Sequence, residues 1–218
     1  IIGHFRYGIH KYTGDNSKYI SWLRHPVERG ISQYFHERKA FLKKQVNAPS
    51  HIAATFAEDL ELRADAYSNT QLKFLTGMED IEHPSADHLL HAYENIEKNF
   101  IALGITEYFT EFVLLLSKQL GWKPVRFANL NTGDIGNVSA GVIKKLETIN
   151  NLDLQLYDFA NRRFQALINE QGEDFHRAKL ELEKNVNKME TYRTTNYLDA
   201  EFTHQDMPAV SSFLGSGS

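Results

Sequence analysis

Residues 19–34 read YISWLRHPVERGISQY, an apolar run that passes through Arg24 into a segment with helical spacing. β-Branched and aromatic side chains dominate residues 18–23, and a turn rich in Gly, Asp and Asn precedes them, which predicts a β-strand. Pro26 suits the first turn of a helix, because its missing N–H would have no partner within the helix there. Apolar residues then recur at helical spacing, so we predict a helix over residues 26–44.

The junction between this strand and this helix suits an anion. Ligands of open α/β sheets bind at the carboxyl ends of the strands, where Arg24 lies. Free N–H groups at the start of a helix favour negative charge, and a guanidinium adds a planar set of donors matched to phosphate. Arg29 and Ser32 are three residues apart and therefore share one face of the helix. A plainer interpretation stays open: both arginines pair with Glu28 or other surface carboxylates, and the serine only fills the helix.

The remaining elements indicate an α/β protein. Residues 1–5 and 100–105 are short apolar runs that predict two more strands. Helices are predicted over residues 51–62, 65–75, 85–99, 107–120, 140–170 with a break near Asn150, and 173–192. Strands and helices alternate early in the chain, which predicts a three-layer α/β fold with a short parallel sheet flanked by many helices. Three strands are few for such a sheet.

The chain has no internal repeat and no low-complexity linker, so we expect residues 1–218 to form a single domain. Residues 213–218 have the composition of a flexible or engineered tail. Hydrophobic residues make up 42% and charged residues 24% of the sequence, which are ordinary values for a globular protein.

Several function classes are disfavoured by composition. The net charge of −4 argues against a nucleic-acid partner, because phosphate contacts usually need a basic surplus. The chain has no cysteine, which excludes disulfides and thiolate metal sites and suits a cytoplasmic protein. Its longest apolar run, residues 112–116, is far too short for a membrane span. Ten histidines are present without a His-Glu-x-x-His pattern, so we predict no metal site.

The string Leu-Arg-x-Pro-x-Glu-Arg-x-x-Ser-x-Tyr at residues 23–34 resembles a known motif. It is similar to the 3′-phosphate-binding motif of sulfotransferases that use PAPS (3′-phosphoadenosine 5′-phosphosulfate), in the family that includes heparan sulfate 2-O-sulfotransferase and its bacterial relatives. In that family the Arg and the Ser eight positions later hold the 3′-phosphate. The resemblance implies that Arg24 and Ser32 do so here and that Arg29 assists. The family usually has Asp where this chain has His25.

Three further segments resemble the same family, in the same order along the chain. Residues 3–10 are similar to its Gly-His-Phe segment, and residues 68–77 to its Asp-Asn-x-Gln-Thr-Arg-Phe-Leu-x-Gly block, with Lys73 in place of the Arg. Residues 93–116 are similar to its Asn-Leu…Gly-Leu-Thr-Glu-Arg-Phe…Leu-Leu stretch. The resemblance therefore covers about residues 1–131, and no match is evident beyond them.

The resemblance implies that His4 is the catalytic base. Sulfuryl transfer needs an in-line approach, and the acceptor hydroxyl must lose a proton as it attacks sulfur. A histidine with the reference pKa of about 6.5 can take that proton at physiological pH. Without the family match, His4 would more simply be a strand-end histidine that is satisfied by backbone groups. His10 is the reserve candidate, although an exposed turn or helix is the simpler place for it.

The family's fold also includes a Pro-Lys-x-x-x-Thr-Ser-type loop around the 5′-phosphosulfate, which is missing from these 218 residues. The chain begins at Ile1 without an initiator Met, so we expect this loop to precede it. The implied function is sulfuryl transfer from PAPS to a hydroxyl acceptor, most simply a carbohydrate, with PAP (adenosine 3′,5′-bisphosphate) as product. Two alternatives stay open: a non-catalytic nucleotide-binding module, and a helical interaction domain in which the Arg-Pro-Ser unit is structural. The sequence indicates neither the acceptor nor the oligomeric state.

Overall fold

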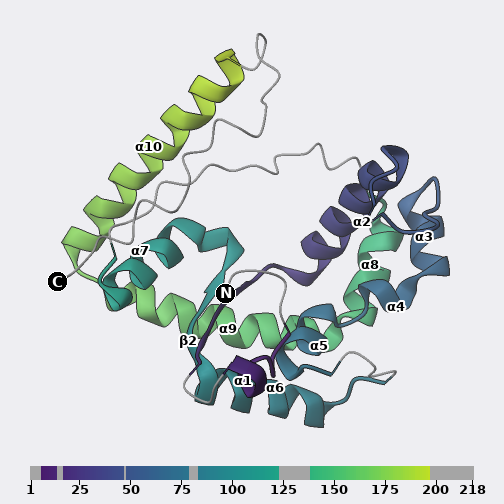
Figure 1. The fold of residues 1–218 in the computed structure, drawn as a ribbon, viewed down its shortest axis with the longest axis horizontal. Coiled ribbons are helices and arrows are strands. Elements are labelled where there is room, and N and C mark those ends of the chain that lie inside the picture. The colour runs from purple at the N-terminus through teal and green to yellow at the C-terminus, as the bar shows by residue number, and fades with distance from the viewer. Residues whose placement is uncertain (1–5, 14–16, 47, 79–82, 123–137, 197–218) are drawn as a thin grey trace.

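The computed structural model describes residues 6–13, 17–46, 48–78, 83–122 and 138–196 (Figure 1). The helices are α1 (His10–Thr13), α2 (Pro26–Leu42), α3 (Phe56–Leu62), α4 (Ala64–Tyr67), α5 (Thr70–Thr76), α6 (Ala86–Asn99), α7 (Phe109–Leu120), α8 (Ala140–Ile149), α9 (Asn151–Asn169) and α10 (Glu173–Asn196), with a 3₁₀ turn η1 (Thr106–Tyr108) before α7. Among these described helices, none has both the length and the apolar character that a membrane span requires.

The described sheet consists of two parallel strands, β1 (Tyr19–Leu23) and β2 (Phe100–Ile105). The carboxyl ends of the two strands are in register, with Leu23 opposite Ile105. Parallel strands need a long crossover connection, and α2 to α6 provide it. The predicted α/β class, a short parallel sheet with many helices, is confirmed. The third predicted strand, residues 1–5, lies outside the described residues.

The largest difference from the sequence-based prediction is at residues 65–75, which do not form one helix. The chain breaks between α4 and α5 because Asn69 adopts a left-handed backbone conformation, with φ 44° and ψ 41°. Besides glycine, asparagine is one of the few residue types that adopt this conformation. The Asn69 side chain then accepts hydrogen bonds from the backbone N–H groups of Leu152 and Asp153, in the first turn of α9. The residue at the break therefore links the start of α5 to the start of α9.

The buried apolar residues form two clusters, one on each side of the molecule. The first lies among the sheet, α5, α6, α7 and α9, and its fully buried members include Leu72, Ile105 and Leu156. The second lies among α2, α3, α4 and α8. Helix α9 runs across the molecule and contacts β2, α2, α5, α6 and α8 (Figure 1). It therefore supports both the strand ends and the start of α2.

Helix α7 packs very closely onto β2. A Cβ atom added at Gly104 would lie 2.3 Å from a ring carbon of Phe112, so only glycine allows this approach. The close packing buries Phe112 and Ile105 at the carboxyl end of β2. Close packing against α7 therefore fixes the carboxyl end of β2.

Candidate functional site

The turn between β1 and α2 is held by side chains from other elements. Gln71 of α5 exchanges two hydrogen bonds with the backbone of Arg24: the Arg24 N–H donates to Gln71 Oε1, and Gln71 Nε2 donates to the Arg24 carbonyl, both at 3.0 Å. One residue earlier, the Leu23 carbonyl accepts a hydrogen bond from Thr106 Oγ1 at 3.0 Å. Because these contacts bind backbone atoms, they fix where the Arg24 side chain leaves the sheet.

The next residue, His25, is also held. Its backbone N–H donates to Glu107 Oε1 at 3.0 Å, and its ring packs edge-on against Tyr157 of α9 with the centroids 5.3 Å apart. Burial and the nearby Glu107 carboxylate raise the pKa of the Tyr157 hydroxyl well above its usual value. His25 stands where the family usually has Asp, and its ring packs against α9.

The Arg24 side chain keeps 30% of its surface exposed, and its Nε lies 3.6 Å from Glu28 Oε2. This contact is the surface pairing that the plainer interpretation of the sequence expects. Glu28 is 53% exposed, and ion pairs of this kind are worth about 0–1 kcal/mol. A phosphate dianion with fuller hydrogen bonding can therefore displace Glu28 from the guanidinium.

Ser32 and Arg29 have different surroundings. Ser32 is partly buried one helical turn after Glu28, and among the described residues none hydrogen-bonds to its hydroxyl. Arg29 Nη1 donates to Gln33 Oε1 at 2.9 Å. Burial lowers the pKa of the Arg29 guanidinium, against the opposing effects of Asp153 and Glu37, the acids near it. Arg29 is therefore engaged inside the protein, whereas Arg24 and Ser32 keep free donor capacity.

The first turn of α2 adds backbone donors beside Arg24. Within the described structure His25 occupies the N-cap position without a side-chain capping bond, and Pro26 follows it at the start of the helix. The early N–H groups of a helix have no partner inside the helix, so those of Val27 and Glu28 remain for solvent or a ligand. A guanidinium, uncapped N–H groups and a hydroxyl together match the needs of a phosphate.

Of the two candidate bases, only His10 lies among the residues that the structure describes. His4 lies outside the described residues. His10 Nδ1 lies 2.6 Å from the hydroxyl of Tyr19, the first residue of β1. His10 is therefore at the amino end of the strand, opposite to Arg24, whereas ligands of such sheets bind at the carboxyl ends. Its position does not favour a catalytic role.

Sequence reasoning missed the residues that support Arg24 from behind. Gln71 was part of a matched segment but had no assigned role, and Asp153 lies beyond the region of resemblance. The Asp153 carboxylate accepts hydrogen bonds from the backbone N–H groups of Gln71 and Leu72. The available signal was local: an Asn at position 150 followed by an Asp three residues later is typical of a helix N-terminus.

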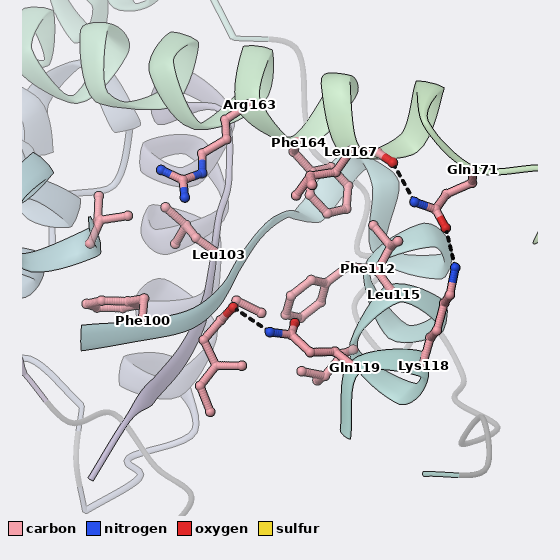
Figure 2. A pocket seen from close by; sticks show the side chains of 14 residues that line it. Phe100, Leu103, Phe112, Leu115, Lys118, Gln119, Arg163, Phe164, Leu167 and Gln171 are labelled. Atoms are coloured by element: carbon pink, nitrogen blue, oxygen red, sulfur yellow. Dashed lines mark hydrogen bonds between the residues drawn. The ribbon is translucent and has the colours of Figure 1, made fainter. Parts of the chain in front are cut away.

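A cavity of about 420 Å³ lies between β2, α7 and α9, away from the Arg24 turn. Figure 2 shows aromatic and aliphatic side chains inside it, with polar side chains at the rim. These polar groups are already engaged: Lys118 Nζ donates to Gln171 Oε1, and Gln119 Nε2 to a β2 carbonyl (Figure 2). The Arg163 guanidinium is paired with the Glu97 carboxylate. The cavity therefore has the character of an apolar packing space.

A second cavity, of about 470 Å³, lies along the later part of α2 beside α3 and α8. The Arg38 guanidinium at its edge is already bound to the Tyr34 hydroxyl and two backbone carbonyls. Of the residues that the structure describes, neither Arg24 nor Ser32 lines either cavity. The same part of the chain contains no group of three or more His, Asp or Glu side chains that could hold a metal ion.

The known proteins that this chain resembles are carbohydrate sulfotransferases by name. A family model described as galactose-3-O-sulfotransferase matches residues 1–204. Heparan-sulfate 6-O-sulfotransferase 1 from Gallus gallus is 25% identical over 172 residues, covering 65% of this chain and 42% of the relative. The Homo sapiens protein of the same name is 25% identical over 177 residues, covering 67% and 43%. Heparan-sulfate 6-O-sulfotransferase 3 from Homo sapiens is 24% identical over 186 residues, covering 72% and 39%. The chain thus spans less than half the length of these curated relatives.

Proposed function

Because the chain belongs to the galactose-3-O-sulfotransferase family, whose model matches residues 1–204, we propose that it transfers a sulfuryl group from PAPS to a carbohydrate hydroxyl. Membership in a sulfotransferase family was predicted from the sequence and is confirmed. The names of the relatives specify heparan sulfate, which supports a carbohydrate acceptor for this protein as well. PAPS as donor follows from the resemblance of residues 23–34 to the 3′-phosphate motif.

The observation that carries the proposal is the arrangement at the end of β1. Arg24 leaves the sheet at a backbone position that Gln71 holds by two hydrogen bonds. Its only ion pair among the described residues is the loose contact with Glu28. The adjoining helix α2 adds N–H groups and the Ser32 hydroxyl, for which the described part of the chain provides no side-chain cap and no hydrogen-bond partner. These donors suit the 3′-phosphate, the group that distinguishes PAPS from ordinary adenine nucleotides.

The reaction assigns one step to each group. His4 accepts the proton of the acceptor hydroxyl while that oxygen attacks sulfur. The bond between sulfur and the bridging 5′-phosphate oxygen breaks, and its electron pair leaves with PAP. Arg24 and Ser32 hold the 3′-phosphate and keep the donor aligned for in-line attack, which is where most of the catalytic advantage of such reactions arises.

Binding of PAP tests this proposal directly. We expect PAP to bind at least tenfold more tightly than adenosine 5′-monophosphate, because a charged hydrogen bond contributes about 1.5–3 kcal/mol. Titration calorimetry at physiological ionic strength measures both affinities, since low salt exaggerates the attraction between exposed charges.

Adenosine 2′,5′-bisphosphate is the matched control, because it has the same charge with one phosphate moved by one carbon. Equal affinity for the two bisphosphates would reduce the effect to general charge attraction and contradict a 3′-phosphate site. An assay of sulfuryl transfer from PAPS to carbohydrate acceptors, on the protein at its full natural length, then separates an enzyme from a nucleotide-binding module. Binding without transfer would support the module.

A further inference from the structure

We propose that Asp153 is a positioning residue for the 3′-phosphate site, acting on Arg24 through Gln71; this inference rests on the proposed function. Asp153 lies in the first turn of α9 and is completely buried. Its two carboxylate oxygens accept hydrogen bonds from the backbone N–H groups of Gln71 and Leu72, at 3.0 and 2.7 Å. The carboxylate therefore fixes the first turn of α5, the helix that carries Gln71.

The second link runs from α5 to the strand end. The Gln71 side chain is itself buried and binds both the N–H and the carbonyl of Arg24 at 3.0 Å. An amide that bonds both backbone groups of one residue fixes that residue in position and in orientation. Displacement of the first turn of α5 would therefore move the point from which the guanidinium extends.

The contacts between α5 and α9 are reciprocal, so the two helices act as one support. While Asp153 binds the start of α5, the Asn69 side chain before α5 binds the N–H groups of Leu152 and Asp153 in α9. The backbone N–H of Asn69 also donates to Asn150 Oδ1 at 2.9 Å. A shift of Arg24 together with α5 would require these hydrogen bonds between α5 and α9 to break.

Asp153 is costly to keep charged in this place. Burial raises the pKa of its carboxyl to about 6, against the opposing effects of the N–H groups of Gln71 and Leu72 and of the Arg29 charge. Arg29, which faces it from α2, is shifted against its own charged form by burial as well. The buried Asp153 and the partly buried Arg29 thus lie next to the residues that support Arg24, where precise placement of a donor matters more than local stability.

The test compares Asp153→Asn with Asp158→Asn, the same substitution at an exposed position of α9. We expect Asp153→Asn to weaken PAP binding by about three- to tenfold, the effect of one hydrogen bond, and to change adenosine 5′-monophosphate binding by less than about twofold. Asp158→Asn should change neither affinity. Equal losses for both nucleotides, or no loss of PAP affinity, would overturn the positioning role.

A double variant separates positioning from general damage. If Asp153 acts through the guanidinium, Asp153→Asn should add less than about twofold to the loss caused by Arg24→Ala, because coupled residues are not additive. Full additivity would overturn the inference.

Should Asp153→Asn fail to fold, as judged by thermal unfolding, Gln71→Met decides instead. It removes both bonds to Arg24 and leaves the bonds from Asp153 to the backbone of α5 in place. It should reduce PAP affinity selectively, and unchanged affinity would overturn the inference. Absence of PAP binding by the unaltered protein would instead reject the proposed function itself.

Discussion

Replacement of Arg24 by alanine is expected to weaken PAP binding by roughly ten- to a hundredfold. The loss of one charged hydrogen bond costs about 1.5–3 kcal/mol, and the Glu28 carboxylate would remain beside the phosphate without its partner. Arg24→Lys should give an intermediate loss, because lysine keeps the charge and lacks the planar pair of donors. Titration calorimetry with PAP measures each affinity.

Two variants on the same helix serve as controls for Arg24→Ala. Lys39→Ala removes an exposed positive charge from the far end of α2 and should leave the affinity unchanged. Glu28→Gln should raise the affinity slightly, because it frees the guanidinium and removes a negative charge from the proposed phosphate site. An unchanged dissociation constant for Arg24→Ala would exclude this residue from the phosphate site.

The fold elements that the sequence predicts correctly are those with strong local signals. The strand before Arg24 and the helix from Pro26 follow from side-chain type and from proline geometry, and both are present as β1 and α2. The separation of α4 from α5 was missed because it depends on one left-handed residue, Asn69, whose partners lie on α9. Long-range capping of this kind leaves little local pattern.

The candidate site also combines residues with a local sequence signal and residues that only distant contacts bring in. Arg24, Arg29 and Ser32 were predicted through their spacing and a family resemblance, and the structure shows that Arg29 donates to Gln33. Helical spacing shows that two residues share a face, but it does not show which one finds an internal partner. Gln71 could not be recognised as a support for Arg24, because the bond joins residues that are distant in sequence.

Two of the matched segments outside the motif have a common physical explanation. Two of the three supply side chains that bind the backbone at the end of β1 and the turn after it: Gln71 from the segment at residues 68–77, and Thr106 and Glu107 from the segment at residues 93–116. Preorganised donors are effective because no reorganisation is needed when the anion arrives. The resemblance therefore extends to the residues that support the proposed phosphate site as well as to the motif itself.

Replacement of His4 by alanine is expected to lower the turnover of the full-length protein by about 10²- to 10⁴-fold, the usual contribution of a general base. PAP affinity should stay within about twofold of the unaltered protein, because in the proposed reaction the base contacts the acceptor and other groups hold the 3′-phosphate. Steady-state transfer assays with PAPS measure turnover, and calorimetry with PAP measures the affinity of the same preparation.

His10→Ala is the matched control for His4→Ala. His10 binds the Tyr19 hydroxyl at the amino end of β1, so its loss should leave the transfer rate largely intact. The opposite pattern, with activity retained in His4→Ala and lost in His10→Ala, would place the reaction at the wrong end of the strand for a phosphate held by Arg24. The two substitutions therefore test whether the reaction depends on His10 at the amino end of β1 or on the proposed base, His4.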